Sequence, residues 1–178
     1  MSILIRPAVT ADIDAIAQLY DGLNDYLAAH GNPPHWKKGV YPIRSHAEDA
    51  LSRGELYVAV IGNTIAGTVV YSPEQGEVYK TVSWGTDFDV PVIVICKLAV
   101  HPAFLGCGVG AKLLDYAAEV GAGRGIKAVR LDVYEENLPA IRLYEKCGFQ
   151  YRGTVDLGLE KLYGLKWYKV FEKLVQTY

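Results

Sequence analysis

Hydrophobic residues follow two spacings along the chain, and the changes between them mark the expected elements. Apolar positions three and four residues apart predict helices, the first two with Thr10 and Ser45 as N-caps. The expected helices cover about residues 10–30, 45–51, 112–121 and 137–147. Runs rich in β-branched and aromatic residues predict strands at residues 3–5, 56–61, 65–71, 92–100, 128–134, 149–155 and 165–174.

Three segments between and within these elements carry further information. Gly62-Asn63 separates two strand-like runs, which predicts a tight antiparallel hairpin. Residues 92–100 are apolar without alternation, as is typical of a central strand buried on both faces. Residues 72–90 are expected to form a loop, with a short strand extension at residues 78–82. Strand, helix, strand and helix then follow in order, which predicts an α/β core.

Composition narrows the class of protein. The 178 residues are 51% hydrophobic and 21% charged, which fits one globular domain over residues 1–178. The formal net charge is −2 and the cations are spread along the chain, which argues against a nucleic-acid or anionic-membrane partner. The first residues lack the pattern of a secretion signal, so a cytoplasmic protein is expected. Cys96, Cys107 and Cys147 match no metal-ligand spacing, which predicts free thiols and no metal site.

The residues after the apolar strand carry the candidate chemistry. Gly106, Gly108 and Gly110 stand at every second position, just before a helical pattern. Glycines at a helix start let successive backbone N–H groups approach phosphate oxygens, where the helix dipole adds positive potential. The pattern therefore predicts a site for a pyrophosphate-bearing cofactor.

Two other interpretations of the glycines are weighed against this one. Gly106-x-Gly108-x-x-Ala111 also satisfies a dinucleotide-binding fingerprint. In that fold the glycine turn follows its strand almost at once near the start of the unit, whereas here several residues intervene after Val100 and the loop lies past mid-chain. An ordinary loop ahead of a helix is the other alternative, and the flanking motifs disfavour it.

Three ordered motifs resemble the GNAT superfamily of acyl-CoA N-acyltransferases over nearly the whole chain. They are residues 5–13, residues 98–110 with Leu98-Ala-Val-His-Pro102, and residues 137–149 with Asn137-Leu-Pro-Ala-Ile-Arg-Leu-Tyr144. The resemblance implies a mixed, mostly antiparallel sheet of about seven strands, with the fourth and fifth strands parallel, and about four helices. It also implies a transferase that uses acetyl-CoA as cosubstrate.

The resemblance assigns the cofactor contacts residue by residue. The amides of the glycine loop would hold the CoA pyrophosphate, and the fourth strand and Asn137 would contact the pantetheine arm. The assigned residues are Leu98, Ala99, Val100, Gly106, Cys107, Gly108, Val109, Gly110, Ala111 and Asn137. In the family the amide at the position of Leu98 meets the thioester oxygen, where negative charge develops. The family commonly has Arg or Gln before the first glycine, but here that residue is Leu105.

Tyr144 is the side chain expected to take part in catalysis. It stands where the family places its tyrosine, seven residues after Asn137. A phenol with a pKa near ~10 beside a thiol near ~8.5 is a plausible proton donor to a leaving thiolate. An aromatic residue packed in a helix is the alternative interpretation.

The general base is left open by the sequence. Many family members have Glu where this chain has Cys96, and a thiol is not an obvious substitute. A water relay to a carboxylate in the loop after the third strand is one alternative, although loop carboxylates are more often solvated charges. The candidates there are Glu74, Glu77, Asp87 and Asp89.

The acceptor is expected to be a primary amine of a small molecule or peptide. Loops 31–44, 72–90 and 156–164 carry aromatic residues and scattered acids, which would suit a cationic amine, ordinary loop packing or a homodimer contact. No Cys–His or Ser–His pairing suggests an acyl-enzyme, so direct transfer is expected. A noncatalytic acyl-CoA-binding module and an O- or longer-chain acyltransferase are the alternatives.

Overall fold

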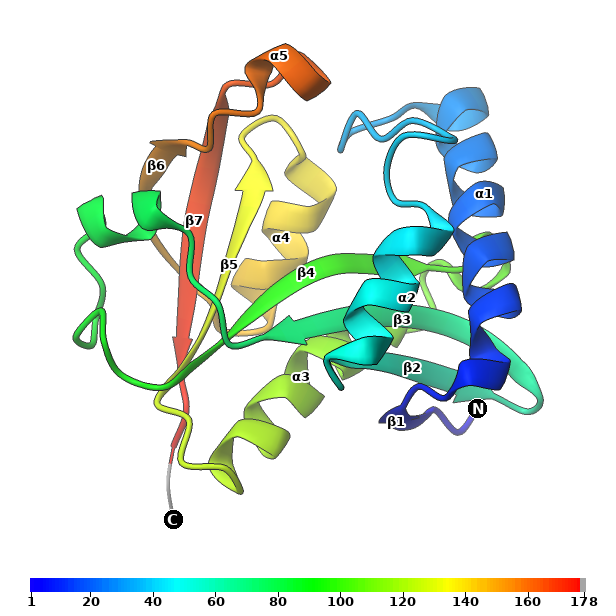
Figure 1. Ribbon diagram of the computed structural model, residues 1–178, viewed down its shortest axis with the longest axis horizontal. Helices are drawn as coiled ribbons and strands as arrows, with labels where there is room; N and C mark the ends of the chain where they lie inside the picture. Colours follow the sequence, from blue (N-terminus) through cyan, green and yellow to red (C-terminus); the bar gives the residue numbers. More distant parts are fainter. Residues whose placement is uncertain (177–178) are drawn as a thin grey trace. The chain divides into compact units, whose positions relative to one another are not determined.

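The computed structural model describes residues 1–176 (Figure 1). The chain divides into two compact units. Unit 1 comprises residues 1–71 and 96–113, and unit 2 comprises residues 72–95 and the described residues from 114. Hydrogen bonds order the strands β1-β2-β3-β4-β5-β7-β6 in a seven-stranded sheet. The expectation of one domain over residues 1–178 stays a prediction, and its residues 177 and 178 lie outside the described part.

The elements have the following bounds. The strands are β1 (Leu4–Pro7), β2 (Leu56–Ile61), β3 (Thr64–Ser72), β4 (Val92–Val100), β5 (Ala128–Tyr134), β6 (Gln150–Asp156) and β7 (Trp167–Leu174). The helices are α1 (Ile13–His30), α2 (Arg44–Ser52), α3 (Val109–Ala122), α4 (Leu138–Lys146) and α5 (Glu160–Tyr163), with 3-10 turns η1 (Thr10–Asp12), η2 (Glu77–Thr81) and η3 (Pro102–Phe104). The predicted mixed fold with about seven strands and about four helices is confirmed, with α5 as a short fifth helix.

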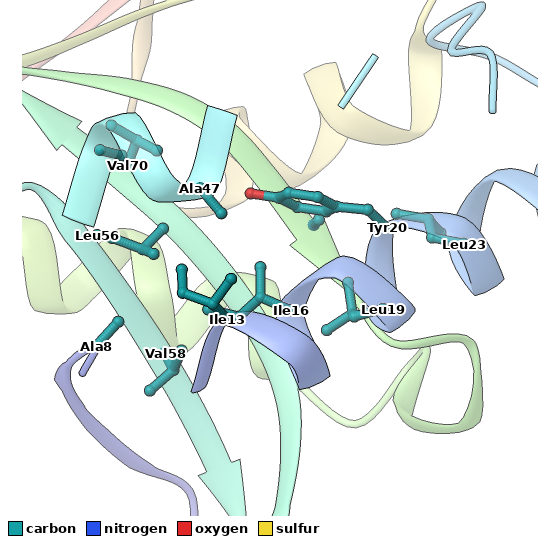
Figure 2. Packing of buried hydrophobic residues seen from close by; sticks show 12 residues of the cluster. Ala8, Ile13, Ile16, Leu19, Tyr20, Leu23, Ala47, Leu56, Val58 and Val70 are labelled. Atoms are coloured by element: carbon teal, nitrogen blue, oxygen red, sulfur yellow. The ribbon is translucent and has the colours of Figure 1, made fainter. Parts of the chain in front are cut away.

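Unit 1 is built on an apolar cluster between helices and strands. Ile13, Ile16, Tyr20 and Leu23 recur on one face of α1 and are buried, because positions three and four apart share a helix face. They pack with side chains of α2, β2 and β3, as Figure 2 shows. β1, β2 and β3 are antiparallel neighbours in this unit, as the hairpin pattern predicts.

Unit 2 combines parallel and antiparallel pairing. The first half of β4 runs parallel to β5, with Val92 opposite Ala128, which confirms the predicted parallel pair. β7 lies antiparallel between β5 and β6. The buried run Val92–Ile95 explains its lack of polar alternation, whereas the next three residues of β4, in unit 1, are half-buried. Figure 1 shows α4 beside β5.

Several local expectations are wrong for identifiable reasons. Thr10 does not cap α1, because the Asp12 carboxylate accepts the Val9 N–H at 2.8 Å and sets the helix start. Ser45 lies inside α2, whose N-cap is Ile43. The strand expected at residues 78–82 is the 3-10 turn η2. Among the described helices, none is long and apolar enough to cross a membrane.

Candidate functional site

The glycine loop of unit 1 leads directly into a helix, as the sequence predicts. Gly106 and Gly108 have φ of 76° and 82°, in the left-handed region that favours glycine. A Cβ atom at either position would meet nothing within 4 Å, so the main chain there is open to an approaching ligand. α3 begins at the next residue, where the first amides of a helix have no acceptor within it. The Cys107 N–H donates to the Phe104 carbonyl at 3.2 Å within the loop. The open main chain at the two glycines and the helix start that follows are features that phosphate sites use.

Gly67 of β3, which the sequence analysis missed, lets the start of α3 pack closely against β3. A Cβ on Gly67 of β3 would lie 2.7 Å from Val109 Cγ1 and 3.2 Å from the Ala99 carbonyl oxygen. No larger residue fits there without displacing the helix. Nearby, the Tyr71 hydroxyl donates to the Leu113 carbonyl at 2.5 Å. The first turns of α3 are therefore fixed against β3 by close packing and one buried hydrogen bond.

The outer half of β4 brings the other predicted cofactor residues of unit 1 together. Ala99 is buried, while Leu98 and Val100 are half-buried. Lys97, just before them, has φ of 51°, which is rare for a residue with a side chain. Such an irregularity locally interrupts strand geometry and is enriched near functional sites. The main chain next to Leu98 thus departs from regular strand geometry.

Tyr144 occupies a buried position on α4 in unit 2. Its ring centroid lies 6.1 Å from that of Phe149 and 6.2 Å from that of Phe171. Burial raises the pKa of its hydroxyl, and the Asp132 carboxylate raises it further. The hydroxyl therefore stays protonated through the neutral and mildly alkaline range, so it can donate a proton and cannot serve as a base.

Asp132 on β5 is the carboxylate next to Tyr144 that the sequence analysis missed. It is half-buried and accepts a hydrogen bond from the Tyr79 hydroxyl at 2.6 Å. The pKa of Tyr168 rises to about 12, first from burial and then from Asp132. A carboxylate among tyrosines therefore lies beside the expected proton donor. Asp132 alternates along β5 with buried Leu131 and Val133, and this pattern could have marked its face as a candidate.

Asn137 acts as the predicted N-cap of α4. Its side-chain oxygen accepts the Ala140 N–H at 3.4 Å, and Pro139 lies in the first turn. This capping orients the helix that carries Tyr144. Its contact with the pantetheine arm stays a prediction. Asn137 and Tyr144 belong to unit 2, whereas the predicted cofactor residues of β4 and the glycine loop belong to unit 1.

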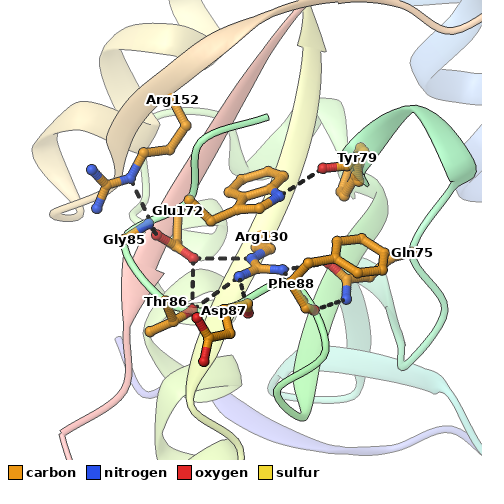
Figure 3. A network of polar contacts seen from close by, with 10 residues as sticks. Gln75, Tyr79, Gly85, Thr86, Asp87, Phe88, Arg130, Arg152 and Glu172 are labelled. Carbon is orange, nitrogen blue, oxygen red and sulfur yellow. Dashed lines mark hydrogen bonds and ion pairs between the residues drawn. The ribbon is translucent and has the colours of Figure 1, made fainter. Parts of the chain in front are cut away.

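A buried ion pair holds part of loop 72–90, one of the three loops that the sequence analysis considered for acceptor recognition. Arg130 and Glu172 are 0% and 1% exposed, and their side chains meet at 2.9 Å (Figure 3). The Arg130 guanidinium also donates to Thr86 Oγ1 at 2.9 Å and to the Asp87 carbonyl at 3.1 Å. It lies 4.3 Å from the Trp84 ring centroid. Residues 84–87 of this loop are therefore held in place by the buried Arg130 guanidinium.

Glu172 completes the same network through its other oxygen. Gly85 donates its backbone N–H at 2.7 Å, and Arg152 donates at 3.1 Å. A Cβ on Gly85 would lie 2.9 Å from the Glu172 carboxylate, so glycine permits this close approach. Tyr79 is buried and Trp84 stacks against Arg130, so these two aromatics pack within the unit.

The carboxylates suggested for a water relay do not form such a network. Glu77 is exposed and pairs with Lys80 at 2.9 Å. Glu74, Asp87 and Asp89 are exposed. Within residues 1–176, no three His, Cys, Asp or Glu side chains are grouped as metal ligands would be.

The structure thus combines a mixed α/β sheet with a glycine loop that leads directly into a helix. A model of the acetyltransferase (GNAT) family matches residues 16–149, and the chain belongs to this family. It is therefore an acetyltransferase by family, and GNAT acetyltransferases use acetyl-CoA.

Relatives and solved structures agree with this assignment. An uncharacterized N-acetyltransferase of Bacillus subtilis, YesJ, is 27% identical over 94% of this chain and 87% of its own length. A GNAT-family acetyltransferase from Streptococcus agalactiae has the same fold, with a TM-score of 0.81 and 22% identity over 98% of this chain and 96% of its own. The Salmonella typhimurium protein yncA, solved with its cofactor acetyl-CoA, has a TM-score of 0.70 and 17% identity over 100% and 96%.

Proposed function

We propose that this protein is an acetyl-CoA-dependent N-acetyltransferase that transfers the acetyl group directly to a primary amine. The observation that carries the proposal is the left-handed pair Gly106 and Gly108, open to a ligand and followed by the start of α3. This geometry suits a pyrophosphate held by main-chain N–H groups. The similar fold of yncA, which was solved with acetyl-CoA, supports the same cofactor.

The cofactor is held mainly by backbone groups in this proposal. The amides of residues 106–111 bind the pyrophosphate, and the main chain at Ala99 and Val100 binds the pantetheine arm together with Asn137. The amide of Leu98 donates to the thioester oxygen and stabilises the negative charge that develops on it during attack. Because backbone donors do this, Leu105 in place of a polar residue removes one contact and leaves the others.

The transfer step needs one proton donor and one proton acceptor. The amine nitrogen attacks the thioester carbon, the C–N bond forms, and the C–S bond breaks with its electrons on sulfur. Tyr144 donates its hydroxyl proton to the leaving thiolate. Asp132 receives the proton that the amine loses and is the carboxylate that can return a proton to Tyr144. The tyrosine hydroxyl of Tyr79 orients the Asp132 carboxylate by its hydrogen bond of 2.6 Å.

No covalent enzyme intermediate is needed. Cys107 is exposed in the glycine loop, where this proposal places phosphates and not the thioester. Mixing the protein with acetyl-CoA alone should therefore give no mass increase of one acetyl group. An adduct that an amine then discharges would contradict direct transfer.

The proposal is tested by CoA release with a panel of primary amines between pH 6 and 9. An ammonium has no lone pair, so the rate should rise with pH as the amine loses its proton. Asp132→Asn should slow the reaction at neutral pH by about 10²–10⁴-fold, and less at high pH, where solvent deprotonates the amine. The matched control Glu119→Gln, at an exposed position on α3, should keep the wild-type rate.

Two outcomes would contradict the proposal. A protein that binds acetyl-CoA but releases CoA with no amine would favour the noncatalytic acyl-CoA-binding module. An Asp132→Asn variant with the wild-type rate and pH profile would remove this carboxylate from the mechanism and leave the transferase assignment intact.

A further inference from the structure

Unit 1 contains buried polar atoms that the fold itself does not satisfy. Tyr20 is fully buried and Asn24 is 3% exposed, and they lie one turn apart on α1. The Tyr20 hydroxyl and the Asn24 side-chain oxygen have no hydrogen-bond partner among the described residues. In Figure 2 the Tyr20 hydroxyl points away from α1 toward Ala47 of α2. Leaving such groups unpaired costs about 1–3 kcal/mol each, so a polar ligand that reaches them would be favoured.

The segment next to these atoms is cationic. Residues 31–44 contain Lys37, Lys38 and Arg44 but no Asp or Glu. The Asn24 amide nitrogen donates to the Tyr41 carbonyl at 3.2 Å, which joins this segment to α1. Ammonium Nζ of Lys97 lies 5.6 Å from the Tyr41 ring centroid. The segment, α1 and the irregular residue of β4 therefore meet around Tyr41.

Lys97 carries an uncompensated charge there. It is half-buried, and no carboxylate of residues 1–176 lies within ion-pair distance of it. Lys38, by contrast, pairs with Asp25 at 2.9 Å, and Arg44 pairs with Asp14. A half-buried cation attracts an anion because screening by water is reduced.

His46 adds a neutral donor to this group. Its Nδ1 accepts the Ile43 N–H at 3.1 Å, so the neutral ring carries its hydrogen on Nε2. Burial and then the charge of Lys97 lower the pKa of His46, while Asp49 opposes the shift, so the ring stays neutral at pH 7. Its ring centroid lies 5.2 Å from that of Tyr41. The group thus offers an ammonium and neutral N–H and O–H donors, with one free acceptor at Asn24.

We propose that this group binds a carboxylate carried by the acetyl acceptor, so that the acceptor is an amine that also bears an acid group. The inference rests on the proposed transferase function and narrows its substrate class. Lys97 pairs with the carboxylate, Tyr20 donates a hydrogen bond to the acceptor, and Asn24 accepts one from it. The acids expected to attract a purely cationic amine are absent from residues 31–44, and this is why a diamine fits this segment less well than an amino acid.

The test compares amines with and without an α-carboxylate, with each rate expressed per concentration of unprotonated amine, because the carboxylate also changes the pKa of the amine. The panel consists of the natural amino acids with the amines that decarboxylation of each would give, such as arginine with agmatine and phenylalanine with phenylethylamine. CoA release gives kcat/KM for each member. The acid of a pair that reacts should be favoured by about 10–100-fold, the range for a hydrogen bond to a charged group.

Substitutions locate the preference. Lys97→Met should lower kcat/KM for the acid by about 10–100-fold and leave that of its decarboxylated partner within about twofold. Lys146→Met, which removes an exposed cation of α4, is the matched control and should leave both values unchanged. Tyr20→Phe should raise KM for the acid without lowering Tm, because the buried hydroxyl it removes is unpaired in the free protein.

The outcomes separate this inference from the proposed function. Preference for the decarboxylated amines, or an equal loss for both members in Lys97→Met, would overturn the carboxylate site while the transferase assignment stands. A Tyr20→Phe variant that loses stability and keeps its KM would show a purely structural hydroxyl and would also overturn it. If no member of this panel is acetylated but another primary amine gives CoA release, the inference fails and the proposed function stands. If no amine at all gives CoA release, both fail.

Discussion

The two units differ in the kind of group that their predicted site residues present. Unit 1 presents its predicted cofactor residues through the main chain, at two left-handed glycines and the start of α3. Unit 2 presents side chains, namely Tyr144 with a raised pKa and Asp132 with its bound Tyr79 hydroxyl. Main-chain donors are fixed by local conformation, whereas reactive side chains depend on what is packed around them. Binding and chemistry should therefore respond to different substitutions.

The interiors of the two units also differ in the polar groups that they bury. The unit 1 cluster is mainly apolar and leaves the Tyr20 and Asn24 oxygens without partners. The interior of unit 2 holds the Arg130–Glu172 ion pair, which also forms hydrogen bonds with residues 85 and 86 of the loop after β3. A buried ion pair is strongly destabilising when one partner is removed. Removal of either charge of this pair should therefore destabilise unit 2 strongly.

Tyr144→Phe gives the sharpest test of a chemical role in unit 2. It should lower kcat by about 10²–10⁴-fold and leave acetyl-CoA affinity unchanged, because the hydroxyl acts on the leaving sulfur and the main chain of unit 1 binds the phosphates. Steady-state kinetics and calorimetry with CoA measure the two effects. The control Tyr151→Phe removes a hydroxyl from an exposed tyrosine of β6 and should retain full activity.

The pH profile sharpens the same prediction. Because burial and Asp132 raise the pKa of Tyr144 above its ordinary value of 10.0, the wild-type rate should not fall through loss of this proton below pH 10. The sign follows from the donor role, since the protonated form is the active one and a raised pKa extends its range. If the wild-type rate declines between pH 8 and 9 and Tyr144→Phe abolishes this decline, the assignment of Tyr144 as a proton donor with a raised pKa is wrong.

The sequence predicts the local features of both units and misses the ones that depend on distant contacts. The glycines before α3 and the Asn137 cap are local signals. The structure has Gly106 and Gly108 in the left-handed region, and it confirms Asn137 as the N-cap of α4. The apolar run of β4 likewise predicts a buried strand, and its first four residues are buried. By contrast, the hydrogen-bonded residues Tyr79 and Asp132 are 53 positions apart in the sequence, and the pattern of a single strand does not predict such a pair.

Gly67 shows the same limit in unit 1. From the sequence alone, a single glycine within a β-rich run predicts only a locally less stable strand. Only the packing of Val109 and the Ala99 carbonyl against it reveals that a side chain there would displace α3. The glycine loop is thus predictable, because it is recognised from a short stretch of sequence. The packing of Gly67 beneath α3 is not, because three separate segments of the chain form that contact.

Glu172→Gln tests the charged interior of unit 2. The substitution keeps size but leaves the fully buried Arg130 without its counter-charge, so the free energy of unfolding should fall by about 3–5 kcal/mol. Urea denaturation followed by circular dichroism measures the loss. Glu77→Gln removes the carboxylate of the exposed pair with Lys80 and should give no measurable change. Equal stability of the two variants would mean that the buried network contributes nothing beyond an exposed pair.

Gly108→Val tests the main-chain site of unit 1 and should have the smallest effect. A β-branched residue is strained at φ of 82°, and its side chain would stand in the space that the phosphates need, so CoA affinity should fall by about tenfold or more. Gly125→Val is the matched control, because Gly125 has φ of 71° and open surroundings in the loop after α3. That control should lose stability to the same strain and bind CoA as the wild type does. If calorimetry instead gives Gly108→Val and the wild type the same CoA affinity, the main chain of unit 1 does not hold the cofactor, and the contrast between a binding unit and a chemical unit fails.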